Sequence, residues 1–248
     1  MNPLLRAWSP APPRPAARHR EWGENVVTIE RGTPFVCSWS GGKESCLSLY
    51  HAVKQGGLPS FLLTILNERG TRSHSHGLER TVLVEQAECL GVPLVTSTAS
   101  WSDYESVFIR TLENLKQAGV EACVFGDIAI DEHREWTKRV CEQAQIAVAL
   151  PVWDKPATEI LAELIVLGFK AMIVAIRDGM LKRDYLGEVL GTELIEEISL
   201  CGIDPAGERG EYHTVVTDGP LFHRPLRLRK GRVVLRSGYA FLNVHLTQ

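Results

Sequence analysis

Six short apolar runs, separated by longer segments with helical spacing, constrain the fold of this chain most strongly. The runs cover residues 34–39, 61–66, 93–96, 122–125, 146–150 and 171–176. Between them, residues 104–118, 132–145 and 157–167 repeat apolar side chains at the period of a helix. Strands alternating with helices predict an α/β fold with a doubly wound, mostly parallel sheet of the Rossmann type, which binds ligands beyond the carboxyl ends of its strands.

The alternation stops after Ile176, which predicts a second unit. We expect a nucleotide-binding domain over residues 33–177 and a smaller C-terminal α+β appendage over residues 178–248. The appendage has a helical segment near residues 192–200 and turn signals at Asp218-Gly219 and Lys230-Gly231, and it is expected to end in a β-hairpin. Residues 1–32 begin with a Pro- and Arg-rich stretch and are predicted to be a disordered leader, with a transit peptide as the alternative.

Composition narrows the class of protein. Hydrophobic residues make up 44% and charged residues 23%, as in soluble globular proteins, and no apolar run reaches the ~18–20 residues that span a bilayer. The six cysteines are widely spaced without a C-x-x-C pair, which argues against a zinc knuckle or redox dithiol and favours a reducing cytoplasm. Residues 223–248 carry only basic charge, which fits either a solvated hairpin or a nucleic-acid contact; without an RNA-binding signature we expect no nucleic acid.

A glycine pair after the first apolar run carries the sharpest functional signal. Residues 37–45 read Cys-Ser-Trp-Ser-Gly-Gly-Lys-Glu-Ser, where the first strand ends and the first helix begins. Glycines let the backbone approach an anion, and a helix N-terminus attracts one. Ser40 and Ser45 can donate hydrogen bonds, Lys43 adds a cation, and the Glu44 carboxylate is suited to magnesium. These features predict a phosphate site, with a plain Gly-Gly turn as the alternative.

This loop resembles the S-G-G-x-D-S loop of the ATP pyrophosphatase superfamily, the PP-loop enzymes. Three further segments, Gly126-Asp127-Ile128, Pro151-Val152-Trp153 and residues 207–214 (GERGEYHT), make the chain similar to the diphthine-ammonia ligase family in its compact archaeal and bacterial form. The resemblance covers about Pro34 to Phe222. It implies a PP-loop, HUP-like fold, ATP and Mg²⁺ as cofactors, and an ATP-dependent carbon–nitrogen ligase. Such an enzyme adenylates an acceptor carboxylate, releases pyrophosphate and lets ammonia displace AMP. Glu44 departs from the aspartate usual in the superfamily loop.

The candidate site follows from this resemblance and from residue chemistry. The expected ATP-binding residues are Ser38, Ser40, Gly41, Gly42, Lys43, Ser45, Gly126 and Asp127. The expected magnesium ligands are Glu44 and Asp127. The acceptor is expected to contact Trp153, Glu211, Tyr212, His213 and Thr214. Three residues are expected to be catalytic: Lys43 would stabilise the leaving pyrophosphate, while Glu211 and His213 would bind ammonium and take its proton.

Structural alternatives stay open for most of these residues. Asp127 could cap the following helix, and Trp153 could belong to the core. Residues 211–213 could form a structural corner, in which the tyrosine fills a gap and the histidine caps a carbonyl. Residues 73–77 (Ser-His-Ser-His-Gly) could lie near the nucleotide or form a flexible polar loop.

The expected partners are ATP, free ammonia and an acceptor. The family implies a protein side chain, the diphthine of elongation factor 2 if the host makes it, and otherwise an unknown carboxylate. We expect no membrane contact and leave a homodimer open. The alternatives in function are a PP-loop RNA-modifying enzyme, disfavoured because C-x-x-C is absent, and a non-catalytic ATP-binding module, disfavoured because Lys43 and Glu44 stand inside the loop.

Overall fold

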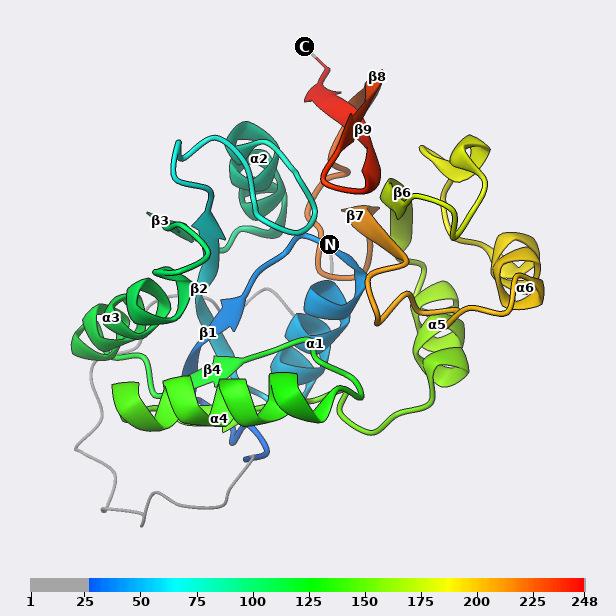
Figure 1. Ribbon diagram of the computed structural model, residues 1–248. Coiled ribbons are helices and arrows are strands. Elements are labelled where there is room, and N and C mark those ends of the chain that lie inside the picture. The colour runs from blue at the N-terminus through cyan, green and yellow to red at the C-terminus, as the bar shows by residue number, and fades with distance from the viewer. Residues whose placement is uncertain (1–26, 248) are drawn as a thin grey trace.

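The computed structural model describes residues 27–247, which form two sheets packed together (Figure 1). The predicted leader therefore lies mostly outside the described residues. Its last residues are an exception: Val27 N donates a hydrogen bond to Val148 O, and Ile29 is buried in the core, so the packed chain begins before residue 33. None of the helices in the described part has the length and hydropathy needed to cross a membrane.

The first sheet is fully parallel, with the order β3-β2-β1-β4-β5. Its strands are β1 (Pro34–Ser38), β2 (Leu58–Leu66), β3 (Leu94–Thr98), β4 (Ala122–Val124) and β5 (Ala147–Ala149). The helices between and after them are α1 (Lys43–Lys54), α2 (Arg80–Leu90), α3 (Tyr104–Gln117), α4 (Asp131–Ala144) and α5 (Ala157–Val166). The predicted α/β class is confirmed.

Helices cover both faces of this sheet because its strands are apolar on both sides. Phe35 and Cys37 of β1 pack with the core formed by α1, α2 and α5, whereas Val36 packs with the core under α3 and α4. This alternation follows from the period of two along a strand. The carboxyl ends of the parallel strands stay free of helices and hold the connecting loops.

The second sheet is antiparallel, with the order β7-β6-β9-β8. It contains β6 (Lys170–Arg177), β7 (Tyr212–Asp218), β8 (Leu228–Arg236) and β9 (Tyr239–Leu246), with a 3₁₀ turn (Arg183–Tyr185) and helix α6 (Thr192–Leu200) between β6 and β7. We expected residues 171–176 to extend the parallel sheet, and this was wrong. All six are buried, and a short apolar run covered on both faces reads the same in either kind of sheet.

The chain ends in the hairpin of β8 and β9, whose turn lies at Ser237 and Gly238, both with positive φ. The expected turn at Lys230-Gly231 instead lies inside β8, where the pairing with β9 shifts register between Lys230 and Val233. A glycine within a strand commonly marks such a bulge, so the same residue type signals either structure.

A buried glutamine joins the two sheets. Val216 N, on the outer edge of β7, donates to Gly41 O at 2.9 Å, so the loop after β1 covers that edge. The fully buried Gln86 of α2 donates from Nε2 to Gly41 O (3.0 Å) and to Val216 O (2.7 Å), and its Oε1 accepts from Trp39 Nε1 (2.9 Å). One side chain thus fixes the glycine loop to the second sheet.

We expect Gln86→Leu to lower the free energy of unfolding by about 2–4 kcal/mol, because it leaves the Trp39 indole N–H unpaired in the core and removes two bonds to carbonyls. Urea denaturation measures this change. Gln143→Leu, at an exposed position of α4, is the matched control and should change stability by less than about 0.5 kcal/mol. Equal effects of the two substitutions would contradict the bridging role of Gln86.

Candidate active site

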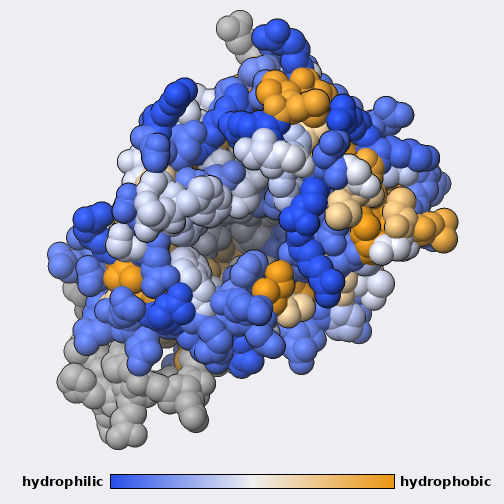
Figure 2. All heavy atoms as spheres, viewed as in Figure 1, coloured by the Kyte–Doolittle hydropathy of each residue, from blue (hydrophilic) through white to orange (hydrophobic). Residues whose placement is uncertain are grey.

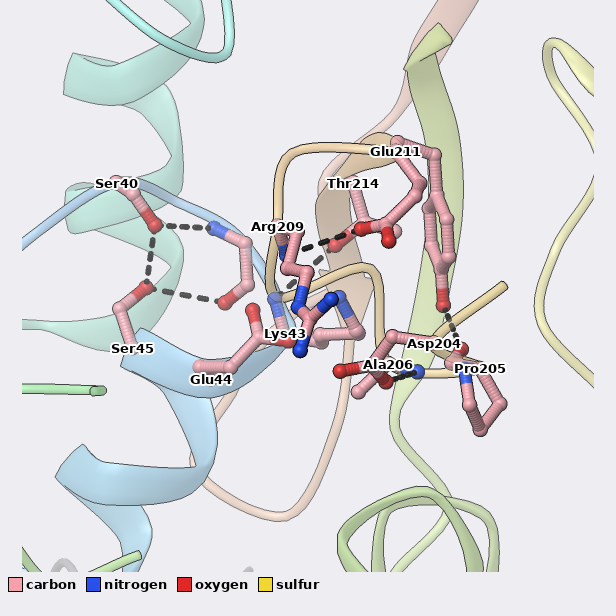
Figure 3. Close-up of polar contacts among 12 residues, drawn as sticks. Ser40, Lys43, Glu44, Ser45, Asp204, Pro205, Ala206, Arg209, Glu211 and Thr214 are labelled. Carbon is pink, nitrogen blue, oxygen red and sulfur yellow. Dashed lines mark hydrogen bonds and ion pairs between the residues drawn. The ribbon is translucent and has the colours of Figure 1, made fainter. Parts of the chain in front are cut away.

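The glycine loop is shaped by two serine hydroxyls. Ser40 Oγ accepts from Gly42 N at 3.2 Å and donates to Ser45 Oγ at 3.2 Å, and Ser45 Oγ donates to Gly42 O at 3.0 Å (Figure 3). Gly41 has φ +80°, a conformation that favours glycine. The loop is therefore held in one shape before any ligand binds, with the N-terminus of α1 directly behind it.

Lys43 is almost fully buried at the start of α1. Its Nζ lies 2.5 Å from Glu44 Oε1 and 4.7 Å from the centre of the Tyr212 ring. Burial alone would lower the pKa of Lys43, but Glu44, Tyr212 and Glu208 together outweigh burial and raise the pKa above the usual value. The lysine is thus a permanent cation placed beside the loop, as stabilisation of phosphate charge requires.

Glu44 and Glu208 act electrostatically on this cation, and Asp127 acts in turn on Glu208. Burial, followed by repulsion from Glu44 and Asp127, raises the pKa of Glu208 to about 8, so Glu208 is largely protonated at neutral pH. The buried Glu44 Oε1 accepts no hydrogen bond of good geometry. The residues fit a divalent cation, because Mg²⁺ commonly takes one or two carboxylates and completes its shell with substrate phosphates and water. Among the described residues, no three His, Cys, Asp or Glu form a metal site by themselves.

Strand β7 presents its side chains alternately, as a strand must. Tyr212 and Thr214 point to the loop: the Tyr212 ring lies under Lys43, and Thr214 Oγ1 accepts from Lys43 N at 3.1 Å. Glu211 is buried, and its Oε2 accepts from Arg209 N at 3.0 Å (Figure 3). The contacts of Tyr212 and Thr214 thus belong to the phosphate loop, and their expected role toward an acceptor stays a prediction.

His213 lies on the other face of β7, in a row of aromatic rings. Its ring centroid is 4.6 Å from that of His76 and 5.8 Å from that of Tyr239, with which it is stacked. Burial, followed by the charges of Lys43 and Arg177, lowers the pKa of His213 to about 4. Burial, followed by the neighbouring His213 and Lys43, also holds the pKa of His76 well below its usual value. Both imidazoles are therefore neutral at pH 7 and able to accept a proton.

The remaining expected residues divide into two places. Gly126 packs on the loop, since a Cβ there would lie 2.9 Å from Ser45 N, and Asp127 Oδ1 lies 3.1 Å from His133 Nδ1. The hydrogen bond to that carboxylate raises the pKa of His133, and it outweighs burial, which would lower the pKa. Trp153 instead packs against the core under α3 and α4, with the Arg134 guanidinium 5.2 Å from its ring centre. None of its described contacts is with residues 211–214, so the structure does not bring it to the other expected acceptor residues.

Sequence reasoning left three neighbours of the site without a role. Glu208 belongs to the GERGEYHT segment, but the sequence does not show which of its two glutamates, Glu208 or Glu211, lies near Glu44 and Asp127. The structure shows that it is Glu208. His76 stands in the loop of residues 73–77, for which two interpretations were open. Arg177 ends β6, and only the antiparallel pairing of β6 with β9 places it beside Tyr239. Figure 2 shows a hollow in this face of the molecule, over the N-terminal end of α1.

Comparison with known families fits this arrangement. The model of the diphthamide synthase N-terminal domain matches residues 35–147, and that of the diphthamide synthase C-terminal domain matches residues 156–246. The loop and the matched domains define the class as an ATP-dependent ligase with a PP-loop nucleotide-binding domain. The chain belongs to the diphthamide synthase family, as the sequence resemblance predicted.

Curated relatives agree with the family. The chain is 26% identical to the human diphthine–ammonia ligase, with 83% of this chain and 86% of that protein aligned. It is 27% identical to the diphthine–ammonia ligase of Schizosaccharomyces pombe, where 80% of this chain covers 36% of a longer protein. A solved structure, described as a predicted subunit of tRNA methyltransferase from Methanocaldococcus jannaschii, aligns with 74% of this chain and 96% of its own at 17% identity and a TM-score of 0.41. At that score the likeness has no bearing on function.

Gly42→Ala tests the loop as the ATP site. A Cβ at Gly42 would lie 2.7 Å from His76 Nε2 and 3.2 Å from Thr214 O, so the His76 ring must turn aside and the loop must shift from β7 by a few tenths of an ångström. We expect ATP affinity, measured by calorimetry, to fall about tenfold or more, which corresponds to about 1.4 kcal/mol. The matched control is Gly191→Ala, because Gly191 also precedes a helix in extended conformation but has open space around it. ATP binding that survives Gly42→Ala unchanged would mean that the loop is only a turn.

The lowered pKa of His213 predicts a pH-dependent stability. The unfolded chain takes up the proton near the ordinary value of 6.5, whereas the folded chain does so only near 4, so stability falls as pH drops through this window. His213→Gln should reduce the loss of unfolding free energy between about pH 7 and pH 5 by about 1–2 kcal/mol. His223→Gln, at an exposed histidine, should leave the slope unchanged. A wild-type slope in the His213→Gln variant would contradict the lowered pKa of His213.

Proposed function

We propose that this protein forms an amide from an acceptor carboxylate and ammonia at the expense of ATP, which it cleaves to AMP and pyrophosphate. The observation that carries the proposal is the contact between the phosphate loop and β7. Strand β7 holds the loop through Thr214 and Val216 and carries His213 on its other face, and Glu211 directly precedes this strand. A site for the nucleotide and a site for a proton acceptor are thus built on the same few residues.

The nucleotide half of the reaction needs positive charge. The helix N-terminus and the loop amides would receive the phosphates, and the buried Lys43 would lie beside the departing pyrophosphate. Glu44 and Asp127 would hold Mg²⁺ together with phosphate oxygens, and the ion would neutralise phosphate charge during the transfer. Binding of a cation would also favour ionisation of Glu208, which the two neighbouring carboxylates disfavour.

The ammonia half needs a base that is neutral at physiological pH. At pH 7 ammonia is mainly ammonium, which must lose a proton before its nitrogen can attack the acyl carbon. Because a ring whose pKa is about 4 is too weak a base for ammonium itself, the ammonium would give its first proton to water, and the neutral His213 ring would take a proton from the nitrogen once it has bonded to the acyl carbon. Glu211 is buried two residues before His213 and would attract the ammonium by its charge. The nitrogen bonds to the acyl carbon and passes its remaining excess proton to His213, and AMP departs with the electrons of the broken bond, which leaves the amide.

The acceptor in this proposal is a protein that carries diphthine, because the relatives are named for that substrate. The alternative acceptor is another carboxylate, and cytoplasmic location and a homodimer stay predictions.

The proposal predicts the products. Incubation with Mg²⁺, ammonium and a diphthine-bearing elongation factor 2 should yield AMP, pyrophosphate and amide in equal amounts, measured by chromatography and by mass spectrometry of the acceptor. ADP and phosphate as products would overturn the adenylation step. AMP formed without amide in the presence of ammonium would overturn the assignment as an amide ligase.

Variants separate the two halves of the site. Glu211→Gln and His213→Ala should leave the Kd for ATP within a few-fold and remove amide formation, because neither side chain contacts the loop. His223→Ala is the exposed control and should retain full activity. A native circular dichroism spectrum together with lost ATP binding in either site variant would contradict the assignment to the ammonia half.

A further inference from the structure

One face of the second sheet carries a row of cations and aromatic rings that the proposed chemistry has not used. Strand pairing sets Arg177 of β6 opposite Tyr239 of β9, and Tyr239 opposite Arg236 of β8. In the next row, Ala175 stands opposite both His213 and Phe241. Directly paired residues share a face, so Arg177, Tyr239 and Arg236 lie side by side with His213 and Phe241.

Arg177 is held in place without a charged partner. Its Nε donates to the Tyr239 hydroxyl at 3.3 Å, and its guanidinium lies 5.7 Å from the centre of the Tyr239 ring. Among the described residues it forms no ion pair, although it is half-buried, whereas the neighbouring exposed Arg183 pairs with Asp178 at 2.8 Å. A half-buried guanidinium with donors to spare is suited to bind a carboxylate through two parallel hydrogen bonds.

Tyr239 and Gly210 fix the orientation of the Arg177 guanidinium. The Tyr239 hydroxyl donates to Gly210 O at 2.8 Å, which ties β9 to the segment before β7. A Cβ at Gly210 would lie 3.3 Å from an Arg177 terminal nitrogen and 2.8 Å from the Tyr239 hydroxyl, so glycine leaves room for both groups. The donor fork is therefore positioned before any ligand arrives.

The row leads from Arg177 to the phosphate loop. Tyr239 is stacked on His213, whose ring lies 4.6 Å from His76, and His76 in turn packs against Gly42. The charge of Arg177 acts on His213, since it contributes to the lowered pKa of that imidazole. A carboxylate bound at Arg177 would therefore lie beside the base of the ammonia half and face the nucleotide loop.

We propose that Arg177 binds the carboxylate of the acceptor and that Tyr239 is the positioning residue for its guanidinium. The inference rests on the proposed function, because it names the group through which that reaction recognises its substrate. The same binding can be measured without ATP and without the reaction.

The first experiment compares variants with the diphthine-bearing elongation factor 2 as acceptor. Arg177→Gln should raise the KM for the acceptor about 10- to 100-fold, the range for a lost hydrogen bond to a charged group, while the Kd for ATP stays unchanged. Arg177→Lys should recover part of the affinity, because it keeps the charge but not the fork. Arg183→Gln removes a nearby exposed arginine and should behave as wild type.

Tyr239→Phe distinguishes carboxylate binding by Arg177 from a purely structural role of Arg177 in supporting Tyr239. If Arg177 only supported Tyr239, loss of the hydroxyl would be as harmful as loss of the guanidinium, and Arg177→Gln would lower stability and ATP affinity together. If Arg177 binds the carboxylate, Tyr239→Phe should raise the KM by less than Arg177→Gln does. Equal KM values for Arg177→Gln and wild type would overturn the proposal even where amide formation itself is observed.

The second experiment uses acetate as the probe and NMR of the His213 ring as the readout. The charged and titratable groups facing this ring are Lys43, His76, Arg177 and Tyr239. Acetate at Arg177 would neutralise part of the local positive field, so it should raise the pKa of His213 in the wild type and not in Arg177→Gln. Chloride at equal ionic strength controls for screening. Absence of an acetate effect in the wild type would overturn the carboxylate site, whereas an acetate effect without any amide formation would overturn only the ligase reaction.

Discussion

The rest of the structure depends on the contact between the loop after β1 and the edge of β7. An edge strand exposes unpaired amides and carbonyls, and a glycine loop at a helix start also has groups to satisfy. Here each covers the other: Val216 N bonds to Gly41 O, Thr214 accepts from Lys43 N, and Gln86 closes the arrangement from α2. The two sheets are therefore one structural unit at the place where chemistry is proposed.

This contact also decides the electrostatics. Packing β7 on the loop buries Lys43 over Tyr212 and brings the segment of Glu208 to the carboxylates of Glu44 and Asp127. The outcome is a buried cation beside a group of acids of which one is largely protonated. On the other face of β7 the same packing partly buries His213, which lowers the pKa of its imidazole and keeps it neutral. One interface thus tunes three titratable groups in directions that suit phosphate binding on one face of the strand and proton transfer on the other.

Much of the first domain could be predicted from the sequence, because local signals determine it. Apolar runs and helical periods indicated the five parallel strands and helices α1, α3, α4 and α5, though not α2. The serines, glycines and lysine of the loop predicted an anion site from chemistry that lies within nine residues. The second sheet was harder to predict from the sequence. Strand β6 is as apolar as a parallel strand, Lys230-Gly231 forms a bulge where a turn was expected, and Arg177 gains its neighbours only through long-range pairing. Residues brought together by antiparallel register leave no short motif.

The edge contact with β7 also bears on the order in which the protein can become competent during its synthesis. The ribosome releases the five parallel strands first, and domains commonly begin to fold as they emerge. At that stage the loop after β1 has its serines and its helix, but Val216 and Thr214 have not yet been made. The proposed nucleotide site is thus incomplete until β7 has folded back onto the loop. A truncated chain that stopped before β7 would contain the whole motif and still lack the strand that shapes it.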